Sequence, residues 1–246
     1  MLSRLILLSV IALAPAGLYN QGNQLYARKD YAGATRAYQQ ALKAGPNPGV
    51  CYNLGNALFK SGRIGAAIVQ FRRAYYLLPR DADIGRNLSF ARSYRVDKVL
   101  AVPGPVARVL DVIFHLLSRR EAALLAAVSC LLAALSLSLW VVRRGTVFVF
   151  GTAVFVALAL FCLITQWVWA GEVGAQPAVV VAREVNALSG PGEEFKQILL
   201  LHDGTEVRIR EKRGGYLLVQ LSGGSGGWIR SDAVERVYSR PPGSLE

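Results

Sequence analysis

The 246-residue sequence has few of the side chains that hold metals, form disulfides or carry out acid–base catalysis. Its only histidines are His115 and His202, so no histidine-rich metal-ligand spacing is present. Of three cysteines, Cys130 and Cys162 fall within long apolar runs, which leaves Cys51 alone and excludes a disulfide framework within one domain. No nucleophile–base pair and no phosphate-cradling glycine loop is recognisable. We therefore expect a protein that is not an enzyme and has no metal or cofactor.

Negative charge is scarce in one part of the chain only. Residues 17–98 contain thirteen Lys/Arg and four Asp/Glu, a balance of +9, whereas residues 178–246 contain nine of each. The formal net charge of +12 is therefore concentrated in the N-terminal half. Such a basic segment favours an anionic lipid surface or an acidic protein as its partner, and we expect no nucleic-acid partner.

Charge is absent altogether from two long stretches, residues 122–142 and residues 146–170. A helix needs about 20 apolar residues to cross a hydrocarbon core, and each stretch is long enough. The ends of the stretches carry three tryptophans, Trp140, Trp167 and Trp169. Amphipathic rings prefer the membrane interface, so we interpret the two stretches as transmembrane helices joined by residues 143–145.

The first seventeen residues, MLSRLILLSVIALAPAG, have the layout of a secretory signal peptide. Arg4 precedes a short apolar core at residues 5–13, and Ala14-Pro15-Ala16 supplies the small residues of a cleavage site. We predict a signal peptide over residues 1–16, and an uncleaved anchor is the alternative. Either places the next segment outside the cytoplasm, with Arg143-Arg144 on the cytoplasmic side, as the positive-inside rule favours.

Residues 17–98 contain a repeat with an offset of 33 residues, starting at Tyr19 and again at Tyr52. The matching small residues are Gly22, Ala34, Ala41, Gly55, Ala67 and Ala74, and the matching large ones are Leu25, Tyr31, Tyr38, Leu58, Ile64 and Phe71. A period of this size predicts stacked helix pairs, which Pro46 and Pro79 would end. Residues 81–94 repeat the first helix alone and would cap the stack. The pattern closely resembles the tetratricopeptide repeat (TPR), which implies an α-solenoid.

In TPR proteins the first helices of the repeats line a concave groove that binds peptides. The polar and aromatic residues at these positions are Tyr19, Asn23, Tyr52, Asn53, Asn56, Arg86 and Asn87. Their side-chain amides can hydrogen-bond an extended peptide, or they are simply solvated. Tyr19 and Asp83 stand where the carboxylate-clamping variety of the family has lysines, so chaperone C-termini are not expected ligands.

Residues 99–121 form an elbow between the repeats and the first apolar stretch. Val102-Pro103-Gly104-Pro105 interrupts the preceding helix, and apolar residues then recur at helical spacing. These are Val106, Val109, Leu110, Ile113, Phe114 and Leu117. We expect an amphipathic helix whose apolar side faces either the lipid headgroups or the capping helix of the repeats.

Residues 178–240 change to short β runs broken by glycine. Hairpin-turn signals occur at Asp203-Gly204, Gly214-Gly215 and Gly223-Gly224. Together with Ser189-Gly190-Pro191-Gly192, Gly204-Thr205, Gly227-Trp228-Ile229 and Asp232-Ala233-Val234, the segment resembles a bacterial SH3 domain, which implies a small all-β barrel. Leu188 and Tyr216 replace an arginine and a tryptophan of that family, so its usual cell-wall peptide groove is altered. Tyr216 and Trp228 form an aromatic platform for a ligand, or Trp228 belongs to the core.

The order of signal peptide, TPR segment, membrane hairpin and SH3-like segment resembles the BatE-like proteins of the Bacteroides aerotolerance (Bat) operon family. This resemblance implies an inner-membrane scaffold with two periplasmic domains. It also implies von Willebrand A domain membrane proteins as partners and, indirectly, a MoxR-type AAA+ ATPase. We thus expect a multi-domain membrane protein that mediates protein–protein interactions. A peptidoglycan-binding module and a regulatory subunit of a membrane enzyme are the alternatives.

Overall fold

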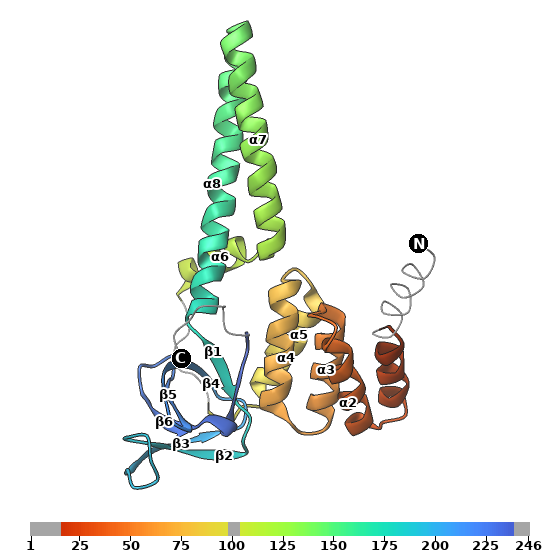
Figure 1. The fold of residues 1–246 in the computed structure, drawn as a ribbon, viewed down its shortest axis with the longest axis vertical. Coiled ribbons are helices and arrows are strands. Elements are labelled where there is room, and N and C mark those ends of the chain that lie inside the picture. Colours follow the sequence, from red (N-terminus) through yellow and green to blue (C-terminus); the bar gives the residue numbers. More distant parts are fainter. Residues whose placement is uncertain (1–15, 98–103, 239–246) are drawn as a thin grey trace, which may run out of the picture. The chain divides into compact units, whose positions relative to one another are not determined.

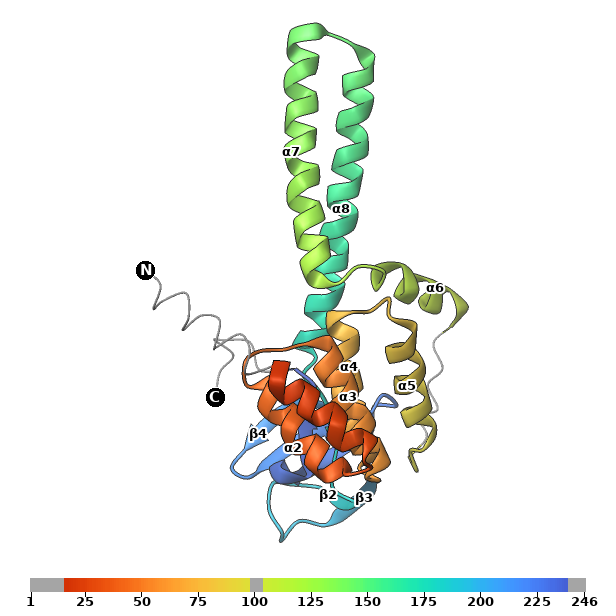
Figure 2. The ribbon, with the colours of Figure 1, turned by 90° about the vertical axis from the view of Figure 1, so that its right-hand side faces the viewer.

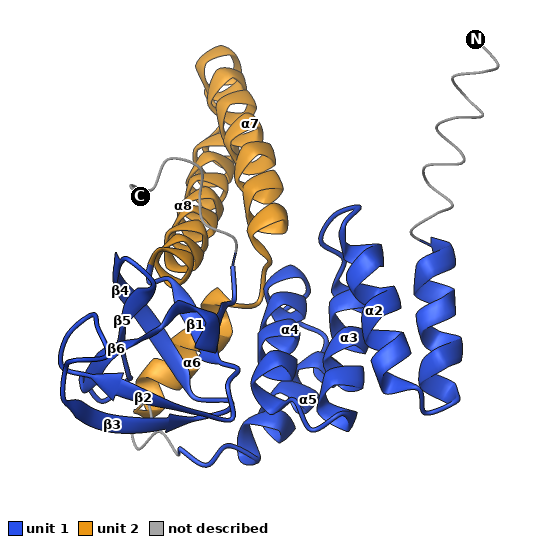
Figure 3. Cartoon of the chain, turned by 60° about the horizontal axis from the view of Figure 1, so that its bottom comes forward, with its two compact units in different colours: residues 1–102, 175–246 blue, residues 103–174 orange. Residues whose placement is uncertain are grey.

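The computed structural model describes residues 16–97 and 104–238 of the chain. Two compact units are present: residues 1–102 together with 175–246, and residues 103–174 (Figure 3). The first unit, unit 1, is discontinuous in sequence, because unit 2 is inserted between its helical part and its β part. Residues 1–15 of the predicted signal peptide, residues 99–103 of the elbow and residues 239–240 of the predicted SH3-like segment lie outside the described residues.

The helical part of unit 1 is a stack of antiparallel helices (Figures 1 and 2). Residues 16–27 are helical, and four helices follow: α2 (Tyr31–Leu42), α3 (Pro48–Lys60), α4 (Ile64–Leu77) and α5 (Ala82–Ser93). The predicted helical repeat is therefore confirmed. An added Cβ on Gly22 would lie 2.4 Å from the Tyr38 ring, and one on Gly55 would lie 2.6 Å from the Phe71 ring. The same close contact thus occurs twice, 33 residues apart, and both rings are 1% exposed.

Local sequence explains where these helices begin and end. Asp30, Asn47 and Asp81 each accept hydrogen bonds from backbone N–H groups two or three residues further on, as N-cap side chains do. The helices α2 and α4 end at Leu42 and Leu77, before Pro46 and Pro79, which cannot continue a helical hydrogen-bond ladder. The residues next to each helix therefore specify where that helix begins or ends.

The β part of unit 1 is a seven-stranded antiparallel sheet with strand order β3-β2-β6-β5-β4-β1-β7. The strands are β1 (Pro177–Val180), β2 (Glu184–Leu188), β3 (Gln197–His202), β4 (Glu206–Arg213), β5 (Tyr216–Gln220), β6 (Gly226–Arg230) and β7 (Val234–Arg236). No pairing among the described strands joins β3 to β7, so the sheet is open and the predicted closed barrel is not found. Val179 on β1 and Val237 after β7 pack into the core of the helical part, which draws this end of the sheet onto the helices.

Two of the three predicted hairpin turns join paired strands. Gly214, between β4 and β5, has φ 56°, and Gly224, between β5 and β6, has φ 88°, a region that favours glycine. The prediction of a hairpin at Asp203-Gly204 is wrong, because β3 and β4 do not pair with each other. This turn instead contacts the helical part, where Asp203 accepts a hydrogen bond from the backbone N–H of Gly65.

Unit 2 contains three helices, α6 (Pro105–Phe114), α7 (Arg119–Arg143) and α8 (Thr146–Gly174) (Figures 1 and 2). The two long apolar helices expected from the sequence are confirmed as α7 and α8. They form an antiparallel hairpin, and Arg144 at its tip has a left-handed φ of 52°. Their most apolar 18 residues have mean hydropathies of 2.3 and 2.8, enough to cross a membrane by length and composition.

Small residues lie where α7 and α8 pack together. The buried positions on α7 are Ala122, Ala126, Ser129, Ala133 and Ser136, and those on α8 include Ala159, Cys162 and Thr165. The hydroxyl of Ser136 also donates a hydrogen bond to the carbonyl of Phe148 at 2.8 Å. Close packing through small residues, with a polar contact between helices, is the pattern found between membrane helices.

Candidate functional site

Side chains of the predicted groove form hydrogen bonds between the first helices of the repeats. The Asn53 amide, on α3, donates to the hydroxyl of Tyr19 and to the side-chain oxygen of Asn23, each at 3.0 Å. The Tyr38 hydroxyl donates to the same Asn23 oxygen at 2.7 Å. Burial, with smaller effects of Tyr19 and Tyr26, raises the pKa of Tyr38 to about 12, so this donor keeps its proton at neutral pH.

The same arrangement recurs one repeat further along the stack. The amide of Asn87, on α5, donates to the Tyr52 hydroxyl at 3.0 Å and to the Asn56 side-chain oxygen at 2.8 Å. Together these bonds make an asparagine ladder, which joins the helix over residues 16–27 to α3 and α3 to α5. The ladder contains six of the seven predicted groove residues: Tyr19, Asn23, Tyr52, Asn53, Asn56 and Asn87. Both amide hydrogens of Asn53 and of Asn87 are thus used inside the protein.

Arg86, the seventh predicted groove residue, does not join the ladder. Its guanidinium pairs with Asp83 on the same helix, and its side chain is 70% exposed. The ladder side chains are half-buried and hold helices together. Arg86 therefore remains more accessible to a partner than the asparagines do.

An aromatic cluster beside the ladder was missed by the sequence analysis. Phe59, Phe90 and Tyr94 form three ring pairs with centroids 5.1–5.4 Å apart. Phe90 is 53% exposed and Tyr94 is 57% exposed. Phe59 follows Asn56 by three residues, and Phe90 follows Asn87 by three. Residues three apart lie on the same face of a helix, so on α3 and α5 the cluster lies on the same faces as the ladder. That spacing was the sequence signal that could have found it.

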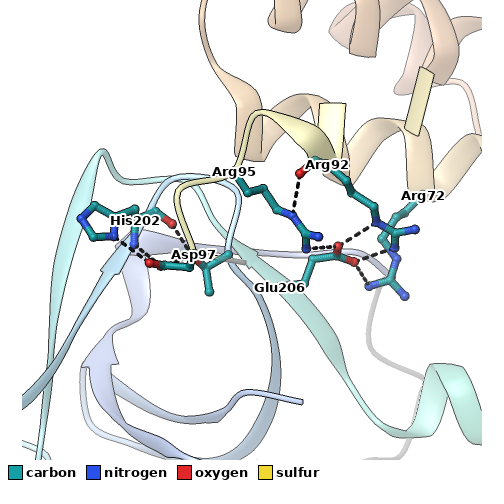
Figure 4. Close-up of polar contacts among 7 residues, drawn as sticks. Arg72, Arg92, Arg95, Asp97, His202 and Glu206 are labelled. Carbon is teal, nitrogen blue, oxygen red and sulfur yellow. Dashed lines mark hydrogen bonds and ion pairs between the residues drawn. The ribbon is translucent and has the colours of Figure 1, made fainter. Parts of the chain in front are cut away.

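A buried carboxylate joins the helical part of unit 1 to its β part (Figure 4). The carboxylate of Glu206, at the start of β4, accepts two hydrogen bonds at 2.8 Å from Arg92. It also accepts one from Arg95 at 2.8 Å and one from Arg72 at 3.2 Å. The side chains of Glu206, Arg72 and Arg95 are only 13–15% exposed. We call these four residues the Glu206 cluster.

The charge of Glu206 is maintained by its arginines. Burial opposes ionisation, but hydrogen bonds and charge from Arg92, with the charges of Arg72 and Arg95, outweigh it and lower the pKa of Glu206. Bidentate arginine–carboxylate pairing adds geometric specificity to this contact. The basic excess of residues 17–98 is therefore partly matched within the protein, by a residue more than 100 positions away.

Further polar contacts support the same junction. Asp97, just after α5, accepts hydrogen bonds from the backbone N–H of His202 at 2.9 Å and from the Thr205 hydroxyl (Figure 4). Arg73, on α4, donates to the carbonyls of Arg236 and Val237 at 2.7 and 2.8 Å. The helical and β parts, which the sequence predicts as separate domains, are therefore packed together in one unit.

The predicted aromatic platform of the β part is largely covered. Trp228 on β6 lies opposite Leu218 on β5, so Tyr216, two residues before Leu218, is its diagonal neighbour on the same face. The Trp228 side chain is only 8% exposed, and the Arg213 guanidinium lies 5.6 Å from its ring centroid. A ligand that stacks on Trp228 would have to displace Arg213.

The described residues contain neither a metal-ligand cluster nor a disulfide. Within residues 16–97 and 104–238, no group of three or more His, Cys, Asp or Glu side chains could hold a metal ion. The three cysteines are free; Cys51 and Cys162 are buried and Cys130 is exposed. Burial raises the pKa of the Cys51 thiol.

Comparison with known proteins identifies one repeat directly. The sequence pattern of the tetratricopeptide repeat matches residues 15–48, so the chain contains a TPR. Among solved structures, the chain is similar to the Sgt2 TPR domain from Aspergillus fumigatus, with 31% identity and a TM-score of 0.31. The similarity covers 32% of this chain and 53% of that one, about half of its length. No curated protein matches the chain.

Proposed function

We propose that this protein is a non-enzymatic, membrane-anchored scaffold that captures a protein segment on the TPR face. The observation that carries the proposal is the exposed aromatic cluster of Phe59, Phe90 and Tyr94 beside the asparagine ladder. Contiguous exposed apolar side chains mark interaction sites on protein surfaces. Aromatic side chains also supply much of the binding energy at such sites.

Charge indicates the chemistry of the captured segment. Residues 17–98 carry a balance of +9, and Arg86 and Lys60 are exposed within one to four residues of the aromatic cluster. An acidic segment with a large apolar side chain would match both features: the apolar group would contact the rings and the carboxylates would lie near the cations.

The resemblance to the Bat operon family supplies a candidate partner, a membrane protein with a von Willebrand A domain. A MoxR-type ATPase would then act on the complex indirectly. We expect such a partner to copurify with the full-length protein from gently solubilised membranes. Replacing Phe90 and Tyr94 together with alanine should reduce copurification about tenfold or more, since loss of each anchor costs more than about 1 kcal/mol.

Leu78→Ala is the matched control for this experiment, because Leu78 is also an exposed apolar residue of the repeats, at 40%, but lies outside the cluster. Asn53→Ala is a poorer choice, since it removes two interhelical hydrogen bonds and confuses binding with stability. Unchanged copurification of the double variant, with normal thermal unfolding, would remove the TPR face from the proposal.

Membrane attachment is proposed through α7 and α8, with both parts of unit 1 on the same side. The support is the Glu206 cluster: the helical part precedes the hairpin and the β part follows it, yet the two are in contact. A hairpin that enters and leaves the bilayer on one side satisfies this connection. With an export signal at residues 1–16, that side would be the periplasm and the tip at Arg143-Arg144 would be cytoplasmic.

Labelling of cysteine variants tests this topology in bacterial spheroplasts, in which the periplasmic face of the inner membrane is exposed to the reagent. Both variants carry Cys130→Ser, which removes the exposed cysteine. We expect a membrane-impermeant maleimide to label Ser222→Cys in intact spheroplasts and Arg143→Cys only after lysis. Labelling in the reverse order would invert the orientation, and labelling of both positions before lysis would exclude a spanning hairpin.

The alternative, a peptidoglycan-binding module, has less support. A sugar ring stacks on an open aromatic face, whereas Trp228 is 8% exposed and Arg213 lies over it. In this proposal the SH3-like β part provides the surface on which the repeats are fixed, and a ligand of its own is secondary.

A further inference from the structure

The helix α6 presents an apolar stripe at the surface of unit 2. Val106 is 71% exposed, Val109 58%, Leu110 47% and Ile113 37%, and no residue of α6 is buried. These four residues recur at helical spacing and so lie on one side of the helix. Surface helices of soluble proteins turn such a stripe inward, so this one requires a partner.

The C-terminal end of α6 is held against α8. The Phe114 ring stacks on Phe161, with centroids 5.8 Å apart. The His115 ring lies 4.4 Å from the Trp169 ring. The indole N–H of Trp169 donates to the carbonyl of Leu117 at 2.9 Å. The C-terminal end of α6 is therefore fixed near the base of the α7–α8 hairpin, and the helix extends sideways from there (Figure 2).

Two adjacent residues show which way the stripe faces. Phe114 contacts Phe161 in the apolar part of α8, whereas the His115 Nε2 lies 3.4 Å from the Glu172 carboxylate near the end of that helix. Phe161 and Glu172 are eleven residues apart, which is about 16 Å along a helix. Phe114 thus points toward the apolar hairpin and His115 toward its polar end.

The position of His115 then orients the whole helix. At about 100° per residue, His115 projects from the side of α6 opposite the centre of the stripe, together with Arg108 and Asp111. Because His115 points to the polar end of α8, the stripe of Val106, Val109, Leu110 and Ile113 faces the same way as the apolar part of the hairpin.

We propose that α6 lies in the bilayer surface, with its stripe at the boundary between headgroups and acyl chains and its polar side in water. This inference rests on the proposed membrane insertion of α7 and α8. An amphipathic helix that is continuous with a membrane span takes this position because both bury apolar surface in one lipid phase. Arg119 and Arg120, at the start of α7, lie at the level where anionic headgroups attract basic side chains.

Nitroxide labels at four consecutive positions test the proposal in the full-length protein. Each variant carries one introduced cysteine, at position 108, 109, 110 or 111, in a Cys130→Ser background. The native Cys51 and Cys162 are buried and remain in place. The protein is reconstituted into vesicles of phosphatidylethanolamine and phosphatidylglycerol. Collision of the label with oxygen, which dissolves in lipid, is compared with collision with a water-soluble nickel chelate.

The expected result is a helical alternation in accessibility. Labels at Val109 and Leu110 should favour oxygen, as a label at the span position Leu131 does. Labels at Arg108 and Asp111 should favour nickel, as a label at Ser222 in the β part does. The change between positions 108 and 109 is the informative contrast, because it compares neighbouring residues of one helix.

Other outcomes separate the inference from the function on which it rests. Nickel access at all four positions, with Leu131 in lipid, would place α6 in water. Protection of Val109 and Leu110 from both reagents would show a protein cover, such as the capping helix of the repeats or a second copy. Either result overturns the inference and leaves the membrane hairpin intact, whereas nickel access at Leu131 would overturn the membrane insertion itself.

Discussion

Replacing Glu206 with glutamine is expected to destabilise the protein by about 3 kcal/mol or more. The substitution keeps the size of the side chain but removes the charge that Arg72, Arg92 and Arg95 share. Two of these arginines are almost buried, so their charges cannot be solvated in place. For a unit of this size, the loss corresponds to a fall in melting temperature of roughly 6–12 °C, measured by circular dichroism in mild detergent.

The same substitution five residues further along β4 is the matched control. Glu211 pairs with Arg213, but its side chain is 45% exposed and that of Arg213 is 66% exposed. Exposed pairs contribute about 0–1 kcal/mol, so Glu211→Gln should scarcely change the melting temperature. Equal effects of the two variants would show that the Glu206 cluster does not hold the two parts of unit 1 together.

Acid should reveal the Glu206 cluster in the wild-type protein. Since the folded-state pKa of Glu206 lies below its ordinary value of 4.5, its ionisation stabilises the folded state above about pH 4.5. That contribution is lost as the pH falls from there through the lowered pKa. Asp97, whose pKa is also lowered, acts in the same direction. Glu206→Gln should therefore flatten, without abolishing, the fall in stability between about pH 4.5 and the lowered pKa.

Replacing Gly65 with alanine is expected to disrupt the same junction from the helical side. An added Cβ at this first turn of α4 would lie 2.2 Å from the backbone oxygen of Val180 and 2.9 Å from the backbone nitrogen of Gly204. Backbone atoms cannot rotate away as a side chain can, so α4 would have to move from β1. The hydrogen bond from the Gly65 N–H to Asp203 would be lost with it. We expect destabilisation of about 3 kcal/mol, within the upper range for overpacking.

Gly85→Ala is the control, and it is expected to change the free energy of unfolding in the opposite direction. Gly85 is also helical, on α5, but nothing lies within 4 Å of the place where its Cβ would be. Alanine there should stabilise the protein by about 0.5–1 kcal/mol, because it restricts the unfolded chain without a clash. Urea unfolding followed by the fluorescence of Trp228, with the unit 2 tryptophans replaced by phenylalanine, would measure both variants. Destabilisation by both would indicate a helix-wide effect rather than a clash at the junction.

These variants also bear on how the scaffold would work. Neither Glu206 nor Gly65 belongs to the aromatic cluster or the asparagine ladder. A loss of partner capture in Glu206→Gln would therefore show that the β part positions the TPR face, since no binding group has been removed. Retained capture would show that the repeats act alone.

Much of the architecture could be predicted because it depends on near neighbours. The repeat is evident in the sequence because the buried rings of Tyr38 and Phe71 each need a glycine sixteen residues earlier, at Gly22 and Gly55, where a Cβ would clash with the ring. The membrane-type helices were visible because length and the absence of charge define them. The turns at Gly214 and Gly224 could be predicted for the same reason, since glycine adopts a positive φ without steric cost whatever its distant neighbours are.

Predictions failed where a residue's role depends on a distant partner. Asp203-Gly204 has the composition of a hairpin turn, but its neighbours β3 and β4 pair with other strands and its carboxylate caps the start of α4. The predicted closed barrel is a second case: among the described strands the sheet is open between β3 and β7, and Val179 and Val237 at its β7 end pack into the core of the helical part.

The helical repeat, the two long apolar helices and the glycine turns follow from the amino-acid sequence alone, because local sterics and apolar periodicity specify them. That the helical and β parts form one unit is evident only from the folded chain. Glu206 lies 111 residues from Arg95 and 134 from Arg72. No local pattern in the sequence distinguishes these arginines from the solvated ones around them. The free energy of a buried ion pair depends on both partners being brought together away from water, which occurs only in the folded protein.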